Sequence, residues 1–252
     1  MKYFRFCMLI FVVTFMVSFT ACRTTEPVAP KGAETPIQQG QSPKPGGSDA
    51  MTAPPHTEMD LGANGIPVRI KGNNLASNVM HLPAYEEAHQ RNDYGEIVFL
   101  VLERHNGFFK LSRPREELRI TSVQKDTLGS AHVKMEQVVE TVPVEGKIVT
   151  AHFNKEGAFY LFQGDFIPSD LLATLSTSPR LTAAEASARA LDAAPTPGST
   201  VQETSLVVFP TSPMEARLAY HVVVAKGLMS RHGIYVDAMD GGILHTTSLV
   251  QH

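Results

Sequence analysis

The chain has 252 residues, of which 43% are hydrophobic and 19% are charged, and its formal net charge is -3. This apolar fraction is enough for an ordinary globular core in one or two domains. The near-neutral balance argues against a nucleic-acid partner, because phosphate binding needs clustered lysine and arginine and the sequence contains no such run.

The N-terminus has the pattern of a secretory signal peptide. Lys2 and Arg5 precede the apolar run FCMLIFVVTFMVSFTA, which is short for a membrane span of about 20 residues. The end of this segment, FTAC, resembles a bacterial lipobox, with Ala21 as the last residue before the cut and Cys22 as the lipidated N-terminus of the mature chain. The alternative is a plain signal peptide that is cut near Ala21 and leaves Cys22 unmodified.

The cysteine content favours lipidation. The chain has two cysteines, and Cys7 lies in the segment that a signal peptidase would remove, so the mature chain keeps only Cys22. A lone thiol is a liability in an oxidising, exported compartment unless it is occupied, and a thioether lipid occupies it. We therefore expect an exported lipoprotein of the bacterial cell envelope, held at a membrane by its acyl chains.

The segment after Cys22 is rich in proline, glycine, serine, threonine and glutamine and has almost no aromatic residues. Such a composition cannot bury enough apolar surface to offset the entropy lost on ordering. We therefore predict a signal peptide at 1–21 and a disordered tether at 22–60.

Folded character begins near Leu61, and the run from Ile97 to Leu102 allows two interpretations. Its composition suits a strand. Its length and its charged continuation, ERHNG, suit a buried helix that ends at Gly107, with Asn92 or Asp93 as the N-cap.

The next segment alternates in short runs that predict an antiparallel meander. The predicted strands are LRITSVQK from Leu118, SAHVKMEQVVE, GKIVTAHFN and AFYLFQGDF, with a hairpin turn that ends at Gly157. In the second strand, one face should carry Val133, Met135, Gln137 and Val139, and the other His132, Lys134, Glu136 and Val138.

The C-terminal part predicts a second small module. After a linker at 168–180, LTAAEASARALDAAP reads as a helix with a capping box between Thr182 and Glu185. Four strands should follow, at Leu206–Phe209, Leu218–Ala225, Gly233–Ala238 and Ile243–Thr246. The predicted fold class is thus α+β, with two small antiparallel-sheet-plus-helix domains at 61–167 and 181–252.

The sequence lacks the common catalytic motifs. None of the ten histidines forms an HExxH pair, and the nearest approach, AYEEAHQ, has no partner histidine. There is no G-x-S-x-G elbow, P-loop, G-x-G-x-x-G or usable catalytic cysteine. We expect a protein that is not an enzyme and has no cofactor.

His132 and His152 fall on strands that should be neighbours, so a metal site is conceivable. Three or four converging ligands are needed, and only Glu136 or Glu145 could complete this set. A solvated or recognition face is the better interpretation, because His and Glu are common cross-strand partners. We therefore predict no metal.

Asp237 and Asp240 near the C-terminal hairpin could be paired carboxylates for acid/base chemistry. Turn chemistry explains Asp240 better, and we expect the side chain of Asp237 to stabilise the adjacent turn.

The stretch Ser122 to Asn154 resembles the propeptide of thermolysin/fungalysin-type metallopeptidases. In that family a V-x-x-D-x-x-G-x-x-H-V-x-x-x-Q strand is followed by G-V-P-V-x-G and V-x-H. Thr141 departs from the family, which usually has Gly there. The matching residues are Val123, Asp126, Gly129, His132, Val133, Gln137, Pro143, Val144, Gly146 and His152.

The downstream unit resembles the PepSY domain of the same propeptides through LTAAEASARAL, RLAYHVVVA and YVDAMDGGIL. In the family, the propeptide helps the enzyme fold and blocks its cleft. Because the chain ends at His252, soon after this unit, the resemblance implies a membrane-anchored inhibitor or folding chaperone that binds an exported zinc metallopeptidase in trans. The predicted recognition residues are His132, Gln137, Pro143, Val144, Gly146, His152 and Asp237.

Two other functions remain open from the sequence. The same domains could form a binding or scaffold module of the cell envelope. The chain could also be the remnant of a truncated thermolysin-type protease precursor.

Overall fold

The computed structural model describes residues 51–227 and 229–250. The predicted signal peptide, Cys22 and the tether up to residue 50 lie outside the described residues. Within the described part, strands hold 41% of the residues and helices 21%, which confirms the α+β class. No described helix has the length and hydropathy of a membrane-spanning segment.

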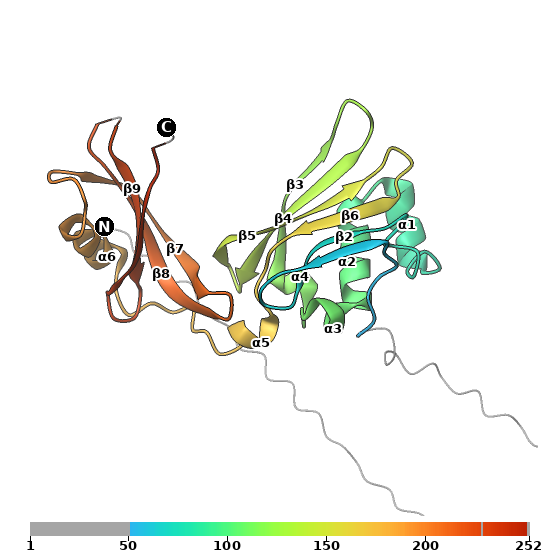
Figure 1. Cartoon of the computed structure of the whole chain (residues 1–252), viewed down its shortest axis with the longest axis horizontal. Coiled ribbons are helices and arrows are strands. Elements are labelled where there is room, and N and C mark those ends of the chain that lie inside the picture. The colour runs from blue at the N-terminus through green and yellow to red at the C-terminus, as the bar shows by residue number, and fades with distance from the viewer. Residues whose placement is uncertain (1–50, 228, 251–252) are drawn as a thin grey trace, which may run out of the picture. The chain divides into compact units, whose positions relative to one another are not determined.

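The elements up to residue 164 are β1 (Glu58–Leu61), β2 (Pro67–Lys71), α1 (Pro83–Arg91), α2 (Tyr94–Arg104), α3 (Asn106–Phe109), α4 (Pro114–Glu117), β3 (Leu118–Lys125), β4 (Ala131–Val139), β5 (Val142–Phe153) and β6 (Phe159–Gly164). The later elements are α5 (Ser169–Leu172), α6 (Ala183–Asp192), β7 (Thr200–Ser212), β8 (Glu215–Ala225), β9 (Arg231–Asp237) and β10 (Ile243–Ser248) (Figure 1).

The ambiguous run is a helix, α2. The side chain of Asp93 accepts a hydrogen bond of 3.1 Å from the amide of Glu96, which makes Asp93 the N-cap. Most of the helix is buried against the sheet, with Ile97, Val98 and Leu102 at 1% exposure or less. A buried helix of this kind is apolar on nearly all sides, so its sequence has strand-like composition.

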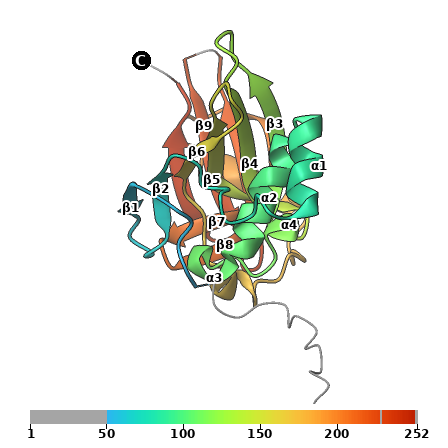
Figure 2. The ribbon, with the colours of Figure 1, turned by 90° about the vertical axis from the view of Figure 1, so that its right-hand side faces the viewer.

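The predicted meander is confirmed. The strands β3, β4, β5 and β6 pair in that order, each antiparallel to its neighbour, and α2 packs against β3 and β4 (Figure 2). The β5–β6 turn has Gly157 at φ 83°, as its hairpin position requires. Its amide donates to the carbonyl of Asn154 at 2.9 Å.

The alternation predicted for β4 is wrong beyond Gln137. The pairing of β4 with β5 is irregular between Glu136, which lies opposite Ile148, and Val138, which lies opposite Pro143. Most of the extra residues are on β5, and strict alternation does not continue through such an irregularity. Val138 is therefore buried, and Val139 is only half-buried.

The strands β1 and β2 extend this sheet and were not predicted. β2 pairs with β6, and β1 pairs with β2, so the last residues of the predicted tether, from Glu58, belong to a strand. All four side chains of β1 are exposed, so its composition carries no burial signal. Backbone pairing and the ion pair of Glu58 with Arg69, at 2.9 Å, stabilise it instead.

A second hydrophobic core lies under α6. The capping box that begins this helix is present, with Thr182 and Glu185 each bonding to the other's backbone. Ala186 and Ala190 are fully buried against β7, β8 and β9. These three strands and β10 form an antiparallel meander, as predicted.

The strand β5 contributes to both cores. Its C-terminal half packs under α2, whereas Val142 and Val144 belong to the second core. Val144 also pairs in parallel with Val208 of β7. The predicted linker contains the short helix α5, whose Leu172 is buried in the second core. The described residues all fall in one compact unit, and the two-domain boundaries stay a prediction.

Candidate recognition surface

His132 and His152 are direct cross-strand partners on β4 and β5, as the sequence predicted. Their Nδ1 atoms lie 2.8 Å apart, and their ring planes meet at 75°. The Nε2 atom of His152 is buried and has no hydrogen-bond partner in the described part of the chain. The two rings therefore form a single hydrogen-bonded pair.

Asp126 approaches this pair from the turn between β3 and β4. Its Oδ2 lies 3.4 Å from Nε2 of His132, and its Oδ1 accepts hydrogen bonds from the amides of Leu128 and Ser130. Desolvation acts to raise the pKa of Asp126. The hydrogen bonds from Ser130 and Leu128 and the contact with His132 outweigh it and lower this pKa below its usual value.

The glutamates considered as further metal ligands lie elsewhere. Glu136 forms an ion pair of 2.8 Å with Arg119, and Glu145 contacts Tyr235 on β9. Burial, together with Glu145, raises the pKa of Tyr235 to about 12. Across residues 51–227 and 229–250, no group of three or more His, Cys, Asp or Glu side chains is arranged to hold a metal ion.

Gln137 is fully buried and acts inside the protein. Its Nε2 donates to the carbonyl of Ile167 at 2.7 Å, and its Oε1 accepts from the amide of Ile167 at 2.8 Å. This pair of bonds fixes the chain that leaves β6 against β4. With no exposed surface, the side chain of Gln137 has nothing to offer to a partner.

The other predicted recognition residues on β5 differ in exposure. Val144 is buried in the second core, Pro143 is half-buried, and Gly146 is exposed. Gly146 has φ 70°, a left-handed conformation that favours glycine. The sequence motif of Pro143, Val144 and Gly146 therefore reflects packing and backbone geometry at least as much as recognition.

Asp237 stabilises the C-terminal turn, as predicted. Its Oδ1 accepts from the amides of Met239 and Asp240, and its Oδ2 pairs with Arg217 at 2.9 Å. Only 2% of Asp237 is exposed. Asp240 accepts from the amide of Gly242 within the same turn, so the two carboxylates have structural partners and do not face a common cleft.

Sequence reasoning missed one feature of β3, its unpaired edge. Among the described strands, β3 pairs with β4 alone, so its other edge has no strand neighbour. Six of its eight residues are exposed and one is half-buried. Two of them are large and apolar, Ile120 at 37% exposure and Val123 at 50%. An exposed edge of this kind can pair with an extended segment of another chain.

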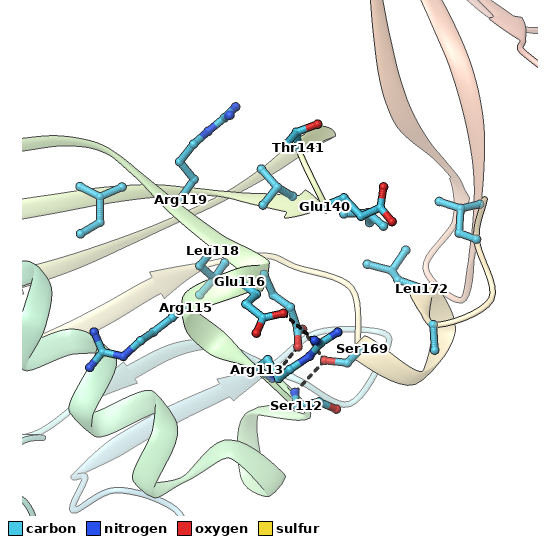
Figure 3. Close-up of a pocket in the computed structure, with 16 residues that line it drawn as sticks. Ser112, Arg113, Arg115, Glu116, Leu118, Arg119, Glu140, Thr141, Ser169 and Leu172 are labelled. Carbon is cyan, nitrogen blue, oxygen red and sulfur yellow. Dashed lines mark hydrogen bonds and ion pairs between the residues drawn. The ribbon is translucent and has the colours of Figure 1, made fainter. Parts of the chain in front are cut away.

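A groove of about 890 Å³ lies beside the start of β3. Figure 3 shows Leu118 and Arg113 on one side of this groove and Leu172 of α5 on the other. Its apolar lining residues are Leu118, Ile120, Val138, Val139, Leu172, Ala173 and Leu175.

The arginines that line the groove are paired with carboxylates. Arg113 contacts Glu116 at 2.6 Å, and Arg119 contacts Glu136. Arg115 bonds to Glu96 and Glu103, each at 2.7 Å. These contacts leave apolar side chains and the strand edge as the unpartnered features of this surface.

Comparison with known families identifies the segment that carries this surface. Residues 116–166 match the family described as the fungalysin/thermolysin propeptide motif. The match runs from the end of α4 to the residues after β6. It therefore contains the paired histidines, Gln137 and the unpaired edge of β3.

Two curated relatives extend the similarity. The chain is 33% identical over 167 residues to a thermostable neutral protease of Geobacillus stearothermophilus. It is 32% identical over 161 residues to a thermolysin of Alicyclobacillus acidocaldarius. Each alignment covers 60% of this chain and 29% of the relative, so the chain spans less than a third of the length of these proteins.

Two solved structures share a weaker similarity, at 14% sequence identity. The C-terminal domain of Bacillus megaterium YpeB has a TM-score of 0.34 and covers 74% of each chain. A putative lipoprotein of Clostridium difficile has a TM-score of 0.27 and covers 62% of this chain and 91% of its own. The family match and the curated relatives together show that residues 116–166 carry a fungalysin/thermolysin propeptide motif, in a chain that is similar over part of its length to thermolysin-type proteases.

Proposed function

We propose that this protein is a non-enzymatic, propeptide-like module that binds an exported metallopeptidase and acts as its inhibitor, its folding chaperone, or both. The observation that supports this proposal is the match of residues 116–166 to a propeptide motif, within a chain related to thermolysin-type precursors. The same segment holds the exposed, unpaired edge of β3.

The binding mode follows from the chemistry of that edge. A strand edge presents backbone N–H and C=O groups, and an extended segment of a partner satisfies them by adding a strand. Side chains at alternate positions of the partner then point toward either face of β3, where Ile120 and Val123 are exposed. The groove beside Leu118 receives an apolar side chain at one end of the added strand.

The proposal includes export and anchoring. A signal peptide at residues 1–21 and lipidation of Cys22 would place the folded part in the bacterial cell envelope, where exported metallopeptidases mature. The tether would let the folded part reach an enzyme near the membrane surface. Mass spectrometry of the mature protein tests this part: a diacylglyceryl group on Cys22 is the expected result, and an unmodified cysteine contradicts it.

The test of the binding mode is an edge variant. The protein is mixed with a thermolysin-type metallopeptidase from the same organism, and peptide hydrolysis and the yield of refolded enzyme are measured. Val123→Glu places a charge at the exposed apolar edge, and we expect it to weaken binding at least tenfold. Met214→Glu is the matched control, because Met214 is 55% exposed in the β7–β8 turn, away from the matched segment.

The outcomes separate the elements of this proposal. Equal loss of binding in both variants would contradict edge pairing and leave another surface as the contact. Unchanged hydrolysis and unchanged refolding yield with the unmodified protein would contradict the proposed function itself. Circular dichroism of each variant confirms that the fold is retained.

A further inference from the structure

The bond between His132 and His152 has one consistent arrangement of protons. A hydrogen bond between two ring nitrogens needs one N–H and one lone pair. The carboxylate of Asp126 faces Nε2 of His132 and favours a proton there. In the neutral pair, Nδ1 of His132 is then the acceptor, and Nδ1 of His152 donates across 2.8 Å.

This arrangement leaves Nε2 of His152 without a proton, in a buried position that lacks a hydrogen-bond partner among the described residues. Protonation of this atom would bury a charge and an unsatisfied N–H together, which costs more than burial of the neutral ring. Burial first, and the neighbouring His132 second, accordingly lower the pKa of His152 below its usual value.

Protonation of both rings is incompatible with the observed geometry. Each cationic imidazole carries an N–H at both nitrogens, so two Nδ1–H donors would face each other across 2.8 Å. The two positive charges would also repel each other at that separation. If His132 alone is protonated, Asp126 compensates its charge, but its Nδ1 then becomes a donor. Nδ1 of His152 must then accept, so the single proton of His152 moves to the buried Nε2.

Among the described residues, the strand pairing places no further carboxylate directly opposite the pair. Gln124 of β3 lies opposite His132, and Leu161 of β6 lies opposite His152. The ring of Tyr160 is centred 6.3 Å from the ring of His152. On the same face of β4, Lys134 stands two residues from His132, roughly 7 Å away by strand geometry. Its positive charge further disfavours protonation of the pair.

We propose that the His132–His152 pair is a pH-sensitive latch that ties β4 to β5 beside the β3–β4 turn and opens in mildly acidic solution. The inference goes beyond the proposed function, because it needs no partner. Opening would loosen the hairpin that carries β3.

The sign of the effect follows from proton binding. In the unfolded chain both histidines titrate near pH 6.5, whereas the folded pair resists taking up both protons. The unfolded state therefore binds more protons below about pH 6.5, and stability is lost as the pH falls through that value. For each proton that the fold excludes, the unfolding equilibrium constant rises by up to about tenfold per pH unit.

The first test is urea denaturation of the whole protein between pH 7.5 and pH 5. We expect the free energy of unfolding of His152→Phe to depend less steeply on pH, by the contribution of one proton. His81→Gln changes an exposed histidine, and we expect it to leave the pH dependence of the unfolding free energy unchanged. A pH dependence in His152→Phe as steep as in the unmodified protein would overturn the inference.

The second test needs no variant, so it holds even if His152→Phe fails to fold. Long-range nitrogen-15 NMR of the histidine rings reports which nitrogen carries the proton and at what pH each ring titrates. We expect His152 to carry its proton on Nδ1 and to titrate below pH 6.5. A proton on Nε2 at neutral pH, or titration at or above pH 6.5, would contradict the latch.

Discussion

Replacement of Gln137 by methionine should destabilise the protein strongly, because this buried side chain holds two backbone groups. Methionine has a similar volume but cannot bond to the amide or the carbonyl of Ile167, which is itself 1% exposed. Each buried group left without a partner costs about 1–3 kcal/mol. The expected loss in the free energy of unfolding is therefore about 2–6 kcal/mol.

Urea denaturation at pH 7 measures this loss. With a urea dependence of about 1–3 kcal/mol per molar, the midpoint should fall by at least about 0.7 M. Gln163→Met is the matched control, because Gln163 is exposed on β6, and an exposed substitution usually changes stability by less than about 0.5 kcal/mol. A loss below about 1 kcal/mol in Gln137→Met, with weakened partner binding, would refute the structural role and restore a recognition role.

Two further substitutions test local features of the fold. Thr182→Ala removes the side chain that accepts a hydrogen bond from the amide of Glu185 at the start of α6. The free energy of unfolding, measured by urea denaturation, should fall by about 1 kcal/mol. An unchanged midpoint would show that the capping box is dispensable. Gly164→Ala should prevent stable folding, because Gly164 has φ 134° and an added Cβ would collide with the carbonyl oxygen of Ile148. A soluble Gly164→Ala variant with the unmodified melting temperature would contradict this reading of the β5–β6 contact.

Local sequence signals identified the elements that have strong caps, turns or alternation. The capping box of Thr182 and Glu185 located α6, and the glycine turn at Gly157 located the β5–β6 hairpin. The turn role of Asp237 also followed from its position on the strand that leads into the Asp240-Gly241-Gly242 turn. These features are encoded within a few residues, so one sequence is enough to read them.

Features that depend on distant partners escaped the sequence. The strand β1 is exposed on all four residues, and its pairing with β2 and the contact between Glu58 and Arg69 stabilise it. The irregular pairing of β5 with the end of β4 reverses the burial predicted for Val138 and Val139, and the sequence of β4 alone cannot show it.

The candidate site shows the same limit. Adjacent strands predicted that His132 and His152 are neighbours, but the approach of Asp126 depends on the conformation of the β3–β4 turn. The bond between Gln137 and Ile167 joins residues 30 positions apart. The motif therefore identified an important residue, and only the structure showed that its role is internal.

The most direct test of the proposed function is inhibition of a thermolysin-type metallopeptidase from the same organism by the purified protein. Hydrolysis of a peptide substrate is measured as the protein is titrated into a fixed amount of enzyme, and refolding yield is measured in parallel. The proposal predicts a saturable loss of hydrolysis, a higher yield of refolded enzyme, or both, and a weaker effect of Val123→Glu than of Met214→Glu. Full enzyme activity at saturating protein, with no gain in refolding, would contradict it.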